Sequence, residues 1–360
     1  MNIGIPKERR SFEYRVGLSP AGVQTLVRQE HKCYIEHEAG LGAGFTDQEY
    51  IQAGGQIVYS PHEVFGRADL LLKFARPLQE EIEWLQPDAT IAGFLHLASA
   101  RQNKVEALLK GAVTAIAYEQ IQLDDGRLPV LRPLSEIGGR MAAQVAARLL
   151  QNDAGGKGIL LGGVAGVPPA EVVIIGAGMV GSNAAFGFMD MGAHVTVLDT
   201  DLNALQRMVE YQRGISTVFS NAKNMERACS YADVLVGAVL VPGQRAPVVV
   251  TREIVRRMKP RALIMDISID QGGCVETSHP TTHERPTFIE EGIIHYCVPN
   301  MPGVIARTST YAFVNAAMPY IVDIANKGVN KAIQDDPALE RAANTYHGEL
   351  RHIAQLTALS

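Results

Sequence analysis

Short apolar runs alternate with segments of helical periodicity through the first part of the chain. Helix starts are indicated by Ser19-Pro20, by Ser60-Pro61, and by Thr46 with Glu49 three residues later, a capping-box pattern. The first of these helices is expected to end near residue 29, and an amphipathic helix is expected between residues 98 and 109. Runs of aliphatic residues predict buried strands, and they lie at residues 3–5, 33–36, 70–73, 90–95 and 113–117.

The second half of the chain repeats this alternation after a long helix. Apolar positions at helical spacing predict that helix over residues 135–150, where it would bridge two domains. A Gly- and Pro-rich segment, residues 155–169, separates it from a second β-α-β series over residues 172–265. Two tail helices are expected at residues 310–326 and 337–356, packed on the first domain because the middle segment already has a complete strand–helix pattern. The pattern predicts an α/β protein with parallel sheets wrapped by helices.

Composition narrows the class of protein. A chain of 360 residues predicts two domains, and 47% hydrophobic residues suit a well-buried globular protein. The net charge of −5, with no block of Lys and Arg, argues against nucleic acid or an anionic membrane as a partner. Four cysteines without a CxxC pair indicate neither a disulfide framework nor a zinc site. The charged N-terminal segment is unlike a signal peptide, and no apolar run of about 20 residues is present. We therefore expect a cytoplasmic protein that does not enter a membrane.

A dinucleotide fingerprint follows the Gly/Pro-rich segment. A β-branched run at residues 171–175 leads directly into the glycines of a G-x-G-x-x-G turn, then a helical segment, a second apolar run and Asp199. Gly176 permits a tight turn, Gly178 lets the backbone approach a pyrophosphate, and Gly181 lets the helix pack closely on the strands. The start of that helix would stabilise the diphosphate. Asp199 would accept hydrogen bonds from the ribose and repel a 2′-phosphate, so the motif predicts NAD as cofactor.

Three residues stand out as candidates for chemistry. Arg15 lies in the first βα connection, His96 follows an apolar run, and Asp270 follows another. Ligands of open α/β sheets gather at the carboxyl ends of strands. Each residue also has a structural interpretation, as a solvated arginine, a core histidine and a turn aspartate. His279 and His283 have the spacing of a helical metal pair, but a proline lies between them, so no metal site is predicted.

The sequence resembles the alanine dehydrogenases, which share ancestry with the NAD-binding subunit of proton-translocating transhydrogenase. The most specific of its shared motifs is Asp270-Gln271-Gly272-Gly273-Cys274. The resemblance covers residues 3–327, and its other carriers are residues 4–8, 13–16, 94–98, 115–119, 138–142, 162–170, 278–283, 300–303 and 307–311. It implies two Rossmann-like doubly wound domains, with an NAD domain (131–304) inserted between the two parts of a catalytic domain (1–130 and 305–360). It also implies a homo-hexamer.

The resemblance further implies roles for individual residues. Arg15 would pair with the substrate carboxylate, since a guanidinium offers a planar two-point contact. His96 and Asp270 would be the acid/base groups, and Asn300 would lie near both the substrate and the nicotinamide. The substrate pocket would also include Ala75, Phe94 and Leu134. The cofactor would contact Ser135, Gly176, Gly178, Met179, Val180, Gly181, Asp199, Ser220, Val239, Leu240, Ile267, Asn300 and Met301.

The chain departs from the family pattern in the pocket. Members carry a substrate-contacting lysine in a Lys-x-Lys-Glu-Pro segment, and Ala75 takes its place here. Phe94 stands where tyrosine is usual, and Leu134 stands where methionine is usual, which is a conservative change. Losing the lysine removes a cation that would hold the carboxylate or polarise the carbonyl. Arg76 is adjacent, but neighbouring residues on a strand point to opposite faces.

Three functional hypotheses follow. The first is reversible NAD-dependent oxidative deamination of L-alanine to pyruvate and ammonia. The second is the same chemistry on another small amino acid or an imine, because Ala75 leaves room for a larger side chain. The third is an NAD-binding homologue without turnover. A transhydrogenase subunit is disfavoured because the sequence shows no apolar membrane segment or linker to one.

Overall fold

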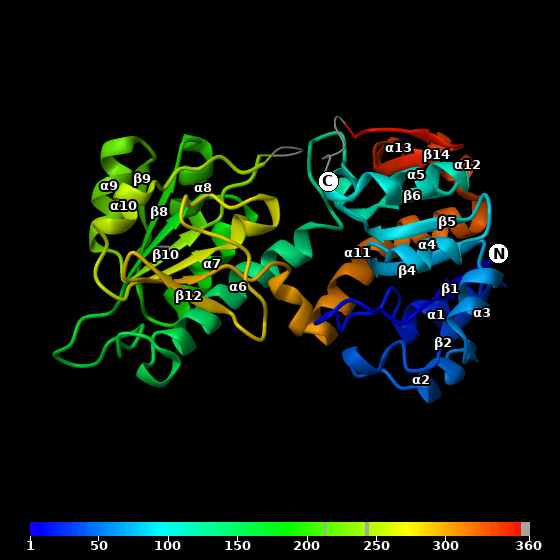
Figure 1. The fold of residues 1–360 in the computed structure, drawn as a ribbon, viewed down its shortest axis with the longest axis horizontal. Coiled ribbons are helices and arrows are strands. Elements are labelled where there is room, and N and C mark those ends of the chain that lie inside the picture. Colours follow the sequence, from blue (N-terminus) through cyan, green and yellow to red (C-terminus); the bar gives the residue numbers. More distant parts are fainter. Residues whose placement is uncertain (212–213, 242–244, 354–360) are drawn as a thin grey trace. The chain divides into compact units, whose positions relative to one another are not determined.

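The structure, a computed structural model, describes residues 1–211, 214–241 and 245–353 (Figure 1). The chain divides into two compact units, unit 1 (Met1–Leu134 with Gly303–Ser360) and unit 2 (Ser135–Pro302). Each unit is a mostly parallel sheet flanked by helices, which confirms the predicted α/β class. Among the described residues, no helix has the length and apolar character needed to cross a bilayer.

The sheet of unit 1 has eight strands in the order β15-β14-β6-β5-β4-β1-β2-β3. The six strands from β1 to β6 run parallel, β14 pairs antiparallel with β6, and β15 pairs antiparallel with β14. The strands are β1 (Asn2–Ile5), β2 (Lys32–Glu36), β3 (Gln56–Val58), β4 (Leu70–Ala75), β5 (Thr90–Phe94), β6 (Thr114–Ala117), β14 (Ala343–Tyr346) and β15 (Glu349–Leu350).

Local signals explain where the first helices of unit 1 begin. The Ser19 side chain accepts a hydrogen bond from the Gly22 amide, and Thr46 and Glu49 form the predicted capping box. Ser60 precedes its helix as predicted, but its side chain makes no capping hydrogen bond. The helices are α1 (Pro20–Val27), α2 (Asp47–Gln52), α3 (Pro61–Arg67), α4 (Gln79–Glu83), α5 (Gln102–Lys110), α11 (Ala306–Lys327), α12 (Val329–Asp335) and α13 (Pro337–Ala342), with short 3-10 turns η1 (Leu41–Ala43), η2 (Leu97–Ser99) and η3 (Tyr118–Gln120).

The tail of the chain corrects one sequence prediction. Of the helix expected over residues 337–356, the described part holds only the six-residue α13, after which the chain forms β14 and β15; residues 354–356 lie outside the described residues. All four residues of β14 are buried, and β14 pairs with β6, more than two hundred residues away in sequence (Figure 1). Pairing with that strand edge outweighs the local helical signal, because a buried backbone must find hydrogen-bond partners.

Unit 2 holds a seven-stranded sheet in the order β12-β13-β11-β10-β7-β8-β9, in which only β12 is antiparallel. The strands are β7 (Glu171–Ile175), β8 (His194–Asp199), β9 (Ser216–Phe219), β10 (Val234–Gly237), β11 (Leu263–Asp266), β12 (Thr287–Glu290) and β13 (Ile293–Tyr296). The helices are α6 (Arg132–Leu149, whose first three residues belong to unit 1), α7 (Met179–Asp190), α8 (Leu202–Tyr211), α9 (Ala222–Tyr231) and α10 (Arg252–Arg256), with 3-10 turns η4 (Asn152–Ala154), η5 (Ile267–Gln271) and η6 (Met301–Val304).

Each sheet has a point where the strand order reverses. In unit 1, β1 is followed along the chain by β2 on one side and later by β4 on the other. In unit 2, β7 has β8 on one side and β10 on the other. Ligands of open α/β sheets bind beyond the carboxyl ends of the strands at such a point. The topology therefore directs attention to the loops after β1 and β4, and after β7 and β10.

Candidate active site

Arg15 lies in the loop that follows β1, at the reversal point of unit 1. Its side chain is buried, and its Nε and Nη2 donate to the two carboxylate oxygens of Glu13 at 2.6 and 2.5 Å. The Arg15 guanidinium carbon also lies 3.5 Å from the centroid of the Phe74 ring, a cation–π contact. One carboxylate and one ring therefore fix the plane of the guanidinium.

Aromatic contacts connect Arg15, through Phe74, to Phe94 and His96. Phe74 packs against Phe94 with ring centroids 4.9 Å apart, and Phe94 is stacked near His96 at 6.5 Å. Ala75, next to Phe74, lies opposite Phe94 in the pairing of β4 with β5. Unit 1 thus gathers Arg15, Ala75, Phe94 and His96 at one edge of its sheet. Leu134, the fifth predicted residue of unit 1, is buried within α6.

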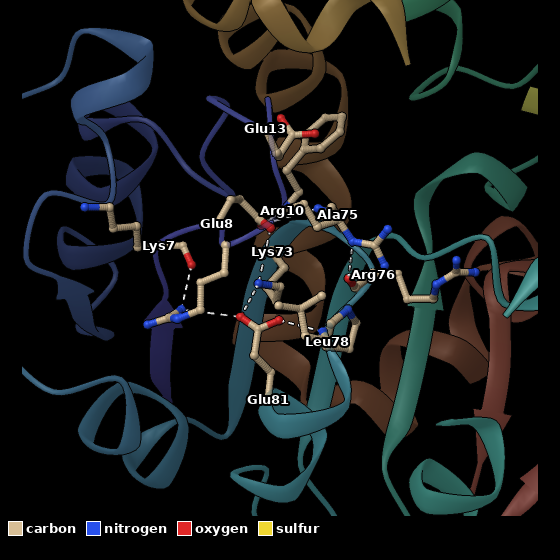
Figure 2. Close-up of polar contacts among 12 residues, drawn as sticks. Lys7, Glu8, Arg10, Glu13, Lys73, Ala75, Arg76, Leu78 and Glu81 are labelled. Carbon is tan, nitrogen blue, oxygen red and sulfur yellow. Dashed lines mark hydrogen bonds and ion pairs between the residues drawn. The ribbon is translucent and has the colours of Figure 1, made fainter. Parts of the chain in front are cut away.

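Three buried charged side chains, Lys73, Glu8 and Glu81, form an ion network next to these residues (Figure 2). Lys73 Nζ lies 2.8 Å from Glu81 Oε1 and 3.2 Å from Glu8 Oε2, and all three side chains are at most 2% exposed. The other oxygen of Glu8 accepts the amides of Phe74 and Ala75 at 2.7 and 3.3 Å. Burial raises the pKa of the Glu8 carboxyl, and the Lys73 charge works against that rise. The network ties the loop after β1 to the end of β4.

Arg76 is the first residue beyond β4. The pairing of β4 with β5 shifts register between Leu72 and Ala75, and β4 ends at Ala75. Arg76 therefore lies outside the strand, and strand alternation does not determine the direction of its side chain. Its Nη1 donates to the His96 carbonyl oxygen at 2.6 Å. Burial and the neighbouring Arg10 guanidinium lower the pKa of Arg76 to about 10, so it stays protonated at neutral pH.

His96 has an unusual backbone for a residue with a side chain. It follows β5 with φ 43° and ψ 48°, in the left-handed region. Its amide donates to Glu119 Oε1 at 2.6 Å, and Glu119 Oε2 accepts the Leu95 amide at 3.2 Å. The His96 side chain is 58% exposed, with Nδ1 3.7 Å from Glu119 Oε1. The imidazole is therefore open to solvent on a firmly held backbone.

In unit 2, the glycine-rich turn connects β7 to α7. A side-chain carbon at Gly176 (φ 104°) would lie 2.4 Å from the Ala238 carbonyl oxygen, across the reversal point. At Gly181 it would lie 1.8 Å from the Gly176 carbonyl oxygen. At Gly178, the residue before Met179 and Val180 at the start of α7, it would meet no atom within 4 Å. The turn thus needs two glycines for packing and leaves open space at the third, where a ligand can approach.

Asp199 at the end of β8 faces this turn. Its Oδ2 accepts the Ala177 amide at 2.6 Å, and its Oδ1 accepts the Asp201 amide at 2.8 Å. Ser220, after β9, is held beside it by a hydrogen bond from its amide to the Asp199 carbonyl at 2.8 Å. After β10, the Val239 amide donates to Ser268 Oγ at 2.9 Å, and Leu240 is half-exposed. These predicted cofactor residues therefore surround the carboxyl ends of the central strands.

Asp270 and Asn300 are neighbours in unit 2. The Asn300 amide donates to both Asp270 carboxylate oxygens, at 3.1 and 3.2 Å, and Asn300 has φ 53°. Asp270 lies in η5 with the predicted cofactor residue Ile267, and Met301 directly follows Asn300 and is buried. Ser135, the last predicted cofactor residue, lies on α6. The structure thus joins two of the predicted residues that are thirty positions apart.

Several residues that build the site were missed from the sequence. Asp266 ends β11 fully buried, and its carboxylate accepts the amides of Ser268, Cys274 and Val275, which shapes the turn that carries Asp270. Burial raises the pKa of Asp266. Glu119 was also missed. Asp266 is the last residue of β11 and Glu119 lies two residues after β6, and a carboxylate at the end of an apolar strand was the signal that could have identified them.

The histidine pair considered for metal binding has other surroundings. The His279 ring stacks on Phe288 with centroids 3.7 Å apart, and Phe288 stacks in turn on the buried His295. Over the described part of the chain, no group of three or more His, Cys, Asp or Glu side chains is arranged to hold a metal ion.

Comparison with known proteins identifies full-length similarity. The profile of the alanine dehydrogenase/PNT N-terminal domain matches residues 4–138, and that of the C-terminal domain matches residues 142–353. The alanine dehydrogenase of Methanococcus maripaludis is 47% identical over 98% of this chain and 95% of its own length. That of Bacillus subtilis is 45% identical over 98% and 93%. The structure of an L-alanine dehydrogenase, 44% identical, superposes with a TM-score of 0.94 over 98% of both chains. A transhydrogenase structure from Sinorhizobium meliloti, 23% identical, shares the fold with a TM-score of 0.83 over 98% of this chain and all of its own.

Proposed function

The chain belongs to the alanine dehydrogenase/PNT family, and on that premise we propose that it catalyses the reversible, NAD-dependent oxidative deamination of L-alanine to pyruvate and ammonia. The observation that carries the proposal is near-complete coverage by alanine dehydrogenases at 44–47% identity, together with the TM-score of 0.94 to an L-alanine dehydrogenase. The resemblance noted in the sequence is thereby confirmed.

The residues of unit 2 fit an NAD molecule. The open space at Gly178 can receive the diphosphate, and the amides at the start of α7 offer donors to it. Asp199 carries its carboxylate beside the turn, where it accepts ribose hydroxyls and repels a 2′-phosphate. When bound, NAD would accept the hydride, the α-hydrogen nucleus with its two bonding electrons, from alanine.

We assign substrate binding to Arg15. Its guanidinium is held in one plane by Glu13 and the Phe74 ring, and a held guanidinium binds a carboxylate with little loss of side-chain entropy. The side chains of Ala75 and Phe94, at the same carboxyl ends of the strands, are apolar and buried. This suits the methyl group of alanine. Arg15 is then the residue that fixes the orientation of the substrate.

We assign proton transfer to His96 and Asp270. One of them takes a proton from the water that adds to the imine carbon of the oxidised substrate, and a proton is returned to the departing ammonia. The His96 imidazole is exposed and so can exchange protons with solvent. The backbone amide of Asn300 donates to both carboxylate oxygens of Asp270 and fixes that side chain. An amide N–H is not a base, so the group that can accept a proton in this pair is the Asp270 carboxylate.

We further propose that the protein acts in the cytoplasm as a homo-hexamer, in line with its family resemblance, with an amino acid and a 2-oxo acid as its small-molecule partners. Light scattering of the purified chain tests the assembly. Six chain masses are expected, and a stable monomer at micromolar concentration would contradict it.

The activity is tested by following NADH formation with a panel of amino acids. L-Alanine is expected to give the highest kcat/KM. The alternative is the same chemistry on another small amino acid or an imine, since Ala75 stands where relatives have lysine, and a better substrate than alanine in the panel would replace the proposal. NADH binding with no turnover on any amino acid would identify a non-catalytic homologue. The variant Ala75→Lys serves as a comparison, because it restores the cation that relatives use.

A further inference from the structure

Two side chains of opposite charge hold the backbone of His96, one at its amide and the other at its carbonyl. On its amide side stands the Glu119 carboxylate, which accepts the amides of both Leu95 and His96. On its carbonyl side stands Arg76, whose Nη1 donates to the His96 oxygen at 2.6 Å. A peptide carbonyl carries partial negative charge and an amide partial positive charge, so both contacts are charge-assisted. We call these two residues the charge clamp.

The clamp draws on three neighbouring strands. Arg76 follows β4, His96 follows β5 and Glu119 follows β6, and these strands are adjacent and parallel. The carboxyl ends of the strands therefore bring the three residues into line. Ser99 adds two donors to the His96 carbonyl, its amide at 3.1 Å and its hydroxyl at 3.0 Å. Arg76 Nη1 also lies 3.4 Å from the Ser99 hydroxyl oxygen.

The backbone of His96 requires such support. A left-handed conformation is unfavourable for a residue with a side chain, and it persists only where the surroundings over-determine it. That conformation sets the direction in which the imidazole leaves the sheet edge. Among the described residues, the contacts to the His96 backbone that carry full charges and arise outside the loop 96–99 come from Arg76 and Glu119.

We propose that Arg76 is a positioning residue that, together with Glu119, holds His96 in its left-handed conformation and so aims the imidazole at the substrate. The inference rests on the proposed function, because it assigns a role around the acid/base residue of that reaction. It also gives the arginine beside Ala75 a task distinct from that of the missing lysine: it acts on His96 rather than on the substrate carboxylate.

The test compares Arg76→Ala and Arg76→Lys with Arg127→Ala, which removes an exposed arginine paired with Asp125 in the same unit. Arg76→Ala is expected to lower kcat for L-alanine about 10- to 100-fold, the usual effect of a small misplacement of a catalytic group. KM for L-alanine and the Kd for NADH should change less than threefold. Ethylguanidinium in the assay should restore part of the kcat lost in Arg76→Ala. The kcat of Arg76→Lys should lie between those of Arg76→Ala and the parent protein.

Two kinetic outcomes would overturn the proposal. One is a folded Arg76→Ala enzyme with kcat within twofold of the parent. The other is a KM for alanine raised more than tenfold at unchanged kcat, because Arg76 would then bind the substrate itself. If Arg76→Ala does not fold, Glu119→Gln takes its place and is expected to lower kcat by a similar factor. An unchanged kcat in Glu119→Gln would also overturn the proposal.

A crystal structure of Arg76→Ala gives an outcome that does not depend on turnover. His96 is expected to leave the left-handed region in this variant, and retention of φ near its present 43° would refute the clamp. This measurement separates the two proposals. If the parent protein shows no activity on alanine, the proposed function fails while the conformational result still decides the role of Arg76.

Discussion

Lys73 offers the most demanding test of how the edge of unit 1 is built. The variant Lys73→Met keeps an unbranched side chain one atom shorter than lysine and removes its charge. Glu8 and Glu81 then remain, each at most 2% exposed, without the cation that both contact. Breaking a buried ion pair by removing one partner is strongly destabilising, because it leaves a buried charge uncompensated.

The expected size follows from the burial of all three groups. Removing the partner of a buried charge destabilises by about 3–5 kcal/mol, and for a unit of this size each kcal/mol lowers the melting temperature by roughly 2–4 °C. Together these give a decrease of about 6–20 °C for Lys73→Met at pH 8. The control is Lys331→Met, whose exposed ion pair with Asp335 should contribute less than about 1 kcal/mol.

The difference in melting temperature between Lys73→Met and the parent should depend on pH. Burial already raises the pKa of Glu8 above its usual value of 4.5, and the variant loses the Lys73 charge that opposes this rise. Because the pKa of Glu8 is higher in the folded than in the unfolded state, the folded variant binds more protons at pH values between the two pKa values. The loss of stability caused by Lys73→Met therefore becomes smaller as the pH falls through the folded pKa of Glu8. Differential scanning fluorimetry from pH 8 to 5 should therefore show a shrinking difference between variant and parent. A melting temperature within 2 °C of the parent at pH 8, or a difference that grows towards pH 5, would refute this reasoning.

Three further predictions concern the cofactor site and the thiols. Gly181→Ala places a carbon 1.8 Å from the Gly176 carbonyl oxygen and should weaken NADH binding at least tenfold by fluorescence titration, whereas Gly66→Ala, with only one atom near at 3.8 Å, should bind normally. Asp199→Asn keeps an oxygen for the Ala177 amide but removes the charge, so the ratio of kcat/KM for NADP to that for NAD should rise at least tenfold; an unchanged ratio would argue against its role at the ribose. Burial raises the pKa of Cys33 and Cys229 to about 12 and that of Cys297 to about 11, so the four buried cysteines should resist Ellman's reagent at pH 8 until the protein is unfolded, and rapid reaction in the native state would contradict this.

Local sequence signals predicted the fold well where local interactions decide it. The capping box at Thr46 and Glu49 has its side-chain and backbone bonds in place, and β1, β2, β4, β5, β6 and β7 lie within a few residues of the predicted apolar runs. The failure lies in the tail. Asp336 and Pro337 do begin a helix there, but β14 follows because β6 offers a free edge. A partner so distant in sequence leaves no local trace.

The site divides in the same way. The glycine turn and Asp199 lie within one βαβ unit, so their spacing in the sequence sufficed to select them together as cofactor residues, although the contact between Asp199 and the Ala177 amide was not predicted. The contacts of Glu8 with Phe74 and of Arg76 with His96 join different strands and depend on the strand order of the sheet. The register shift near the end of β4 and the end of the strand at Ala75 are also invisible in the sequence, so strand alternation alone could not place the Arg76 side chain.

The measurement that tests the account most directly is a crystal structure of the protein with NADH and pyruvate. The account predicts the pyruvate carboxylate within hydrogen-bond distance of the Arg15 guanidinium, the diphosphate at the start of α7, and the His96 imidazole near the carbonyl carbon. A carboxylate bound by Arg76 instead of Arg15, or a dinucleotide bound away from Gly178, would contradict it.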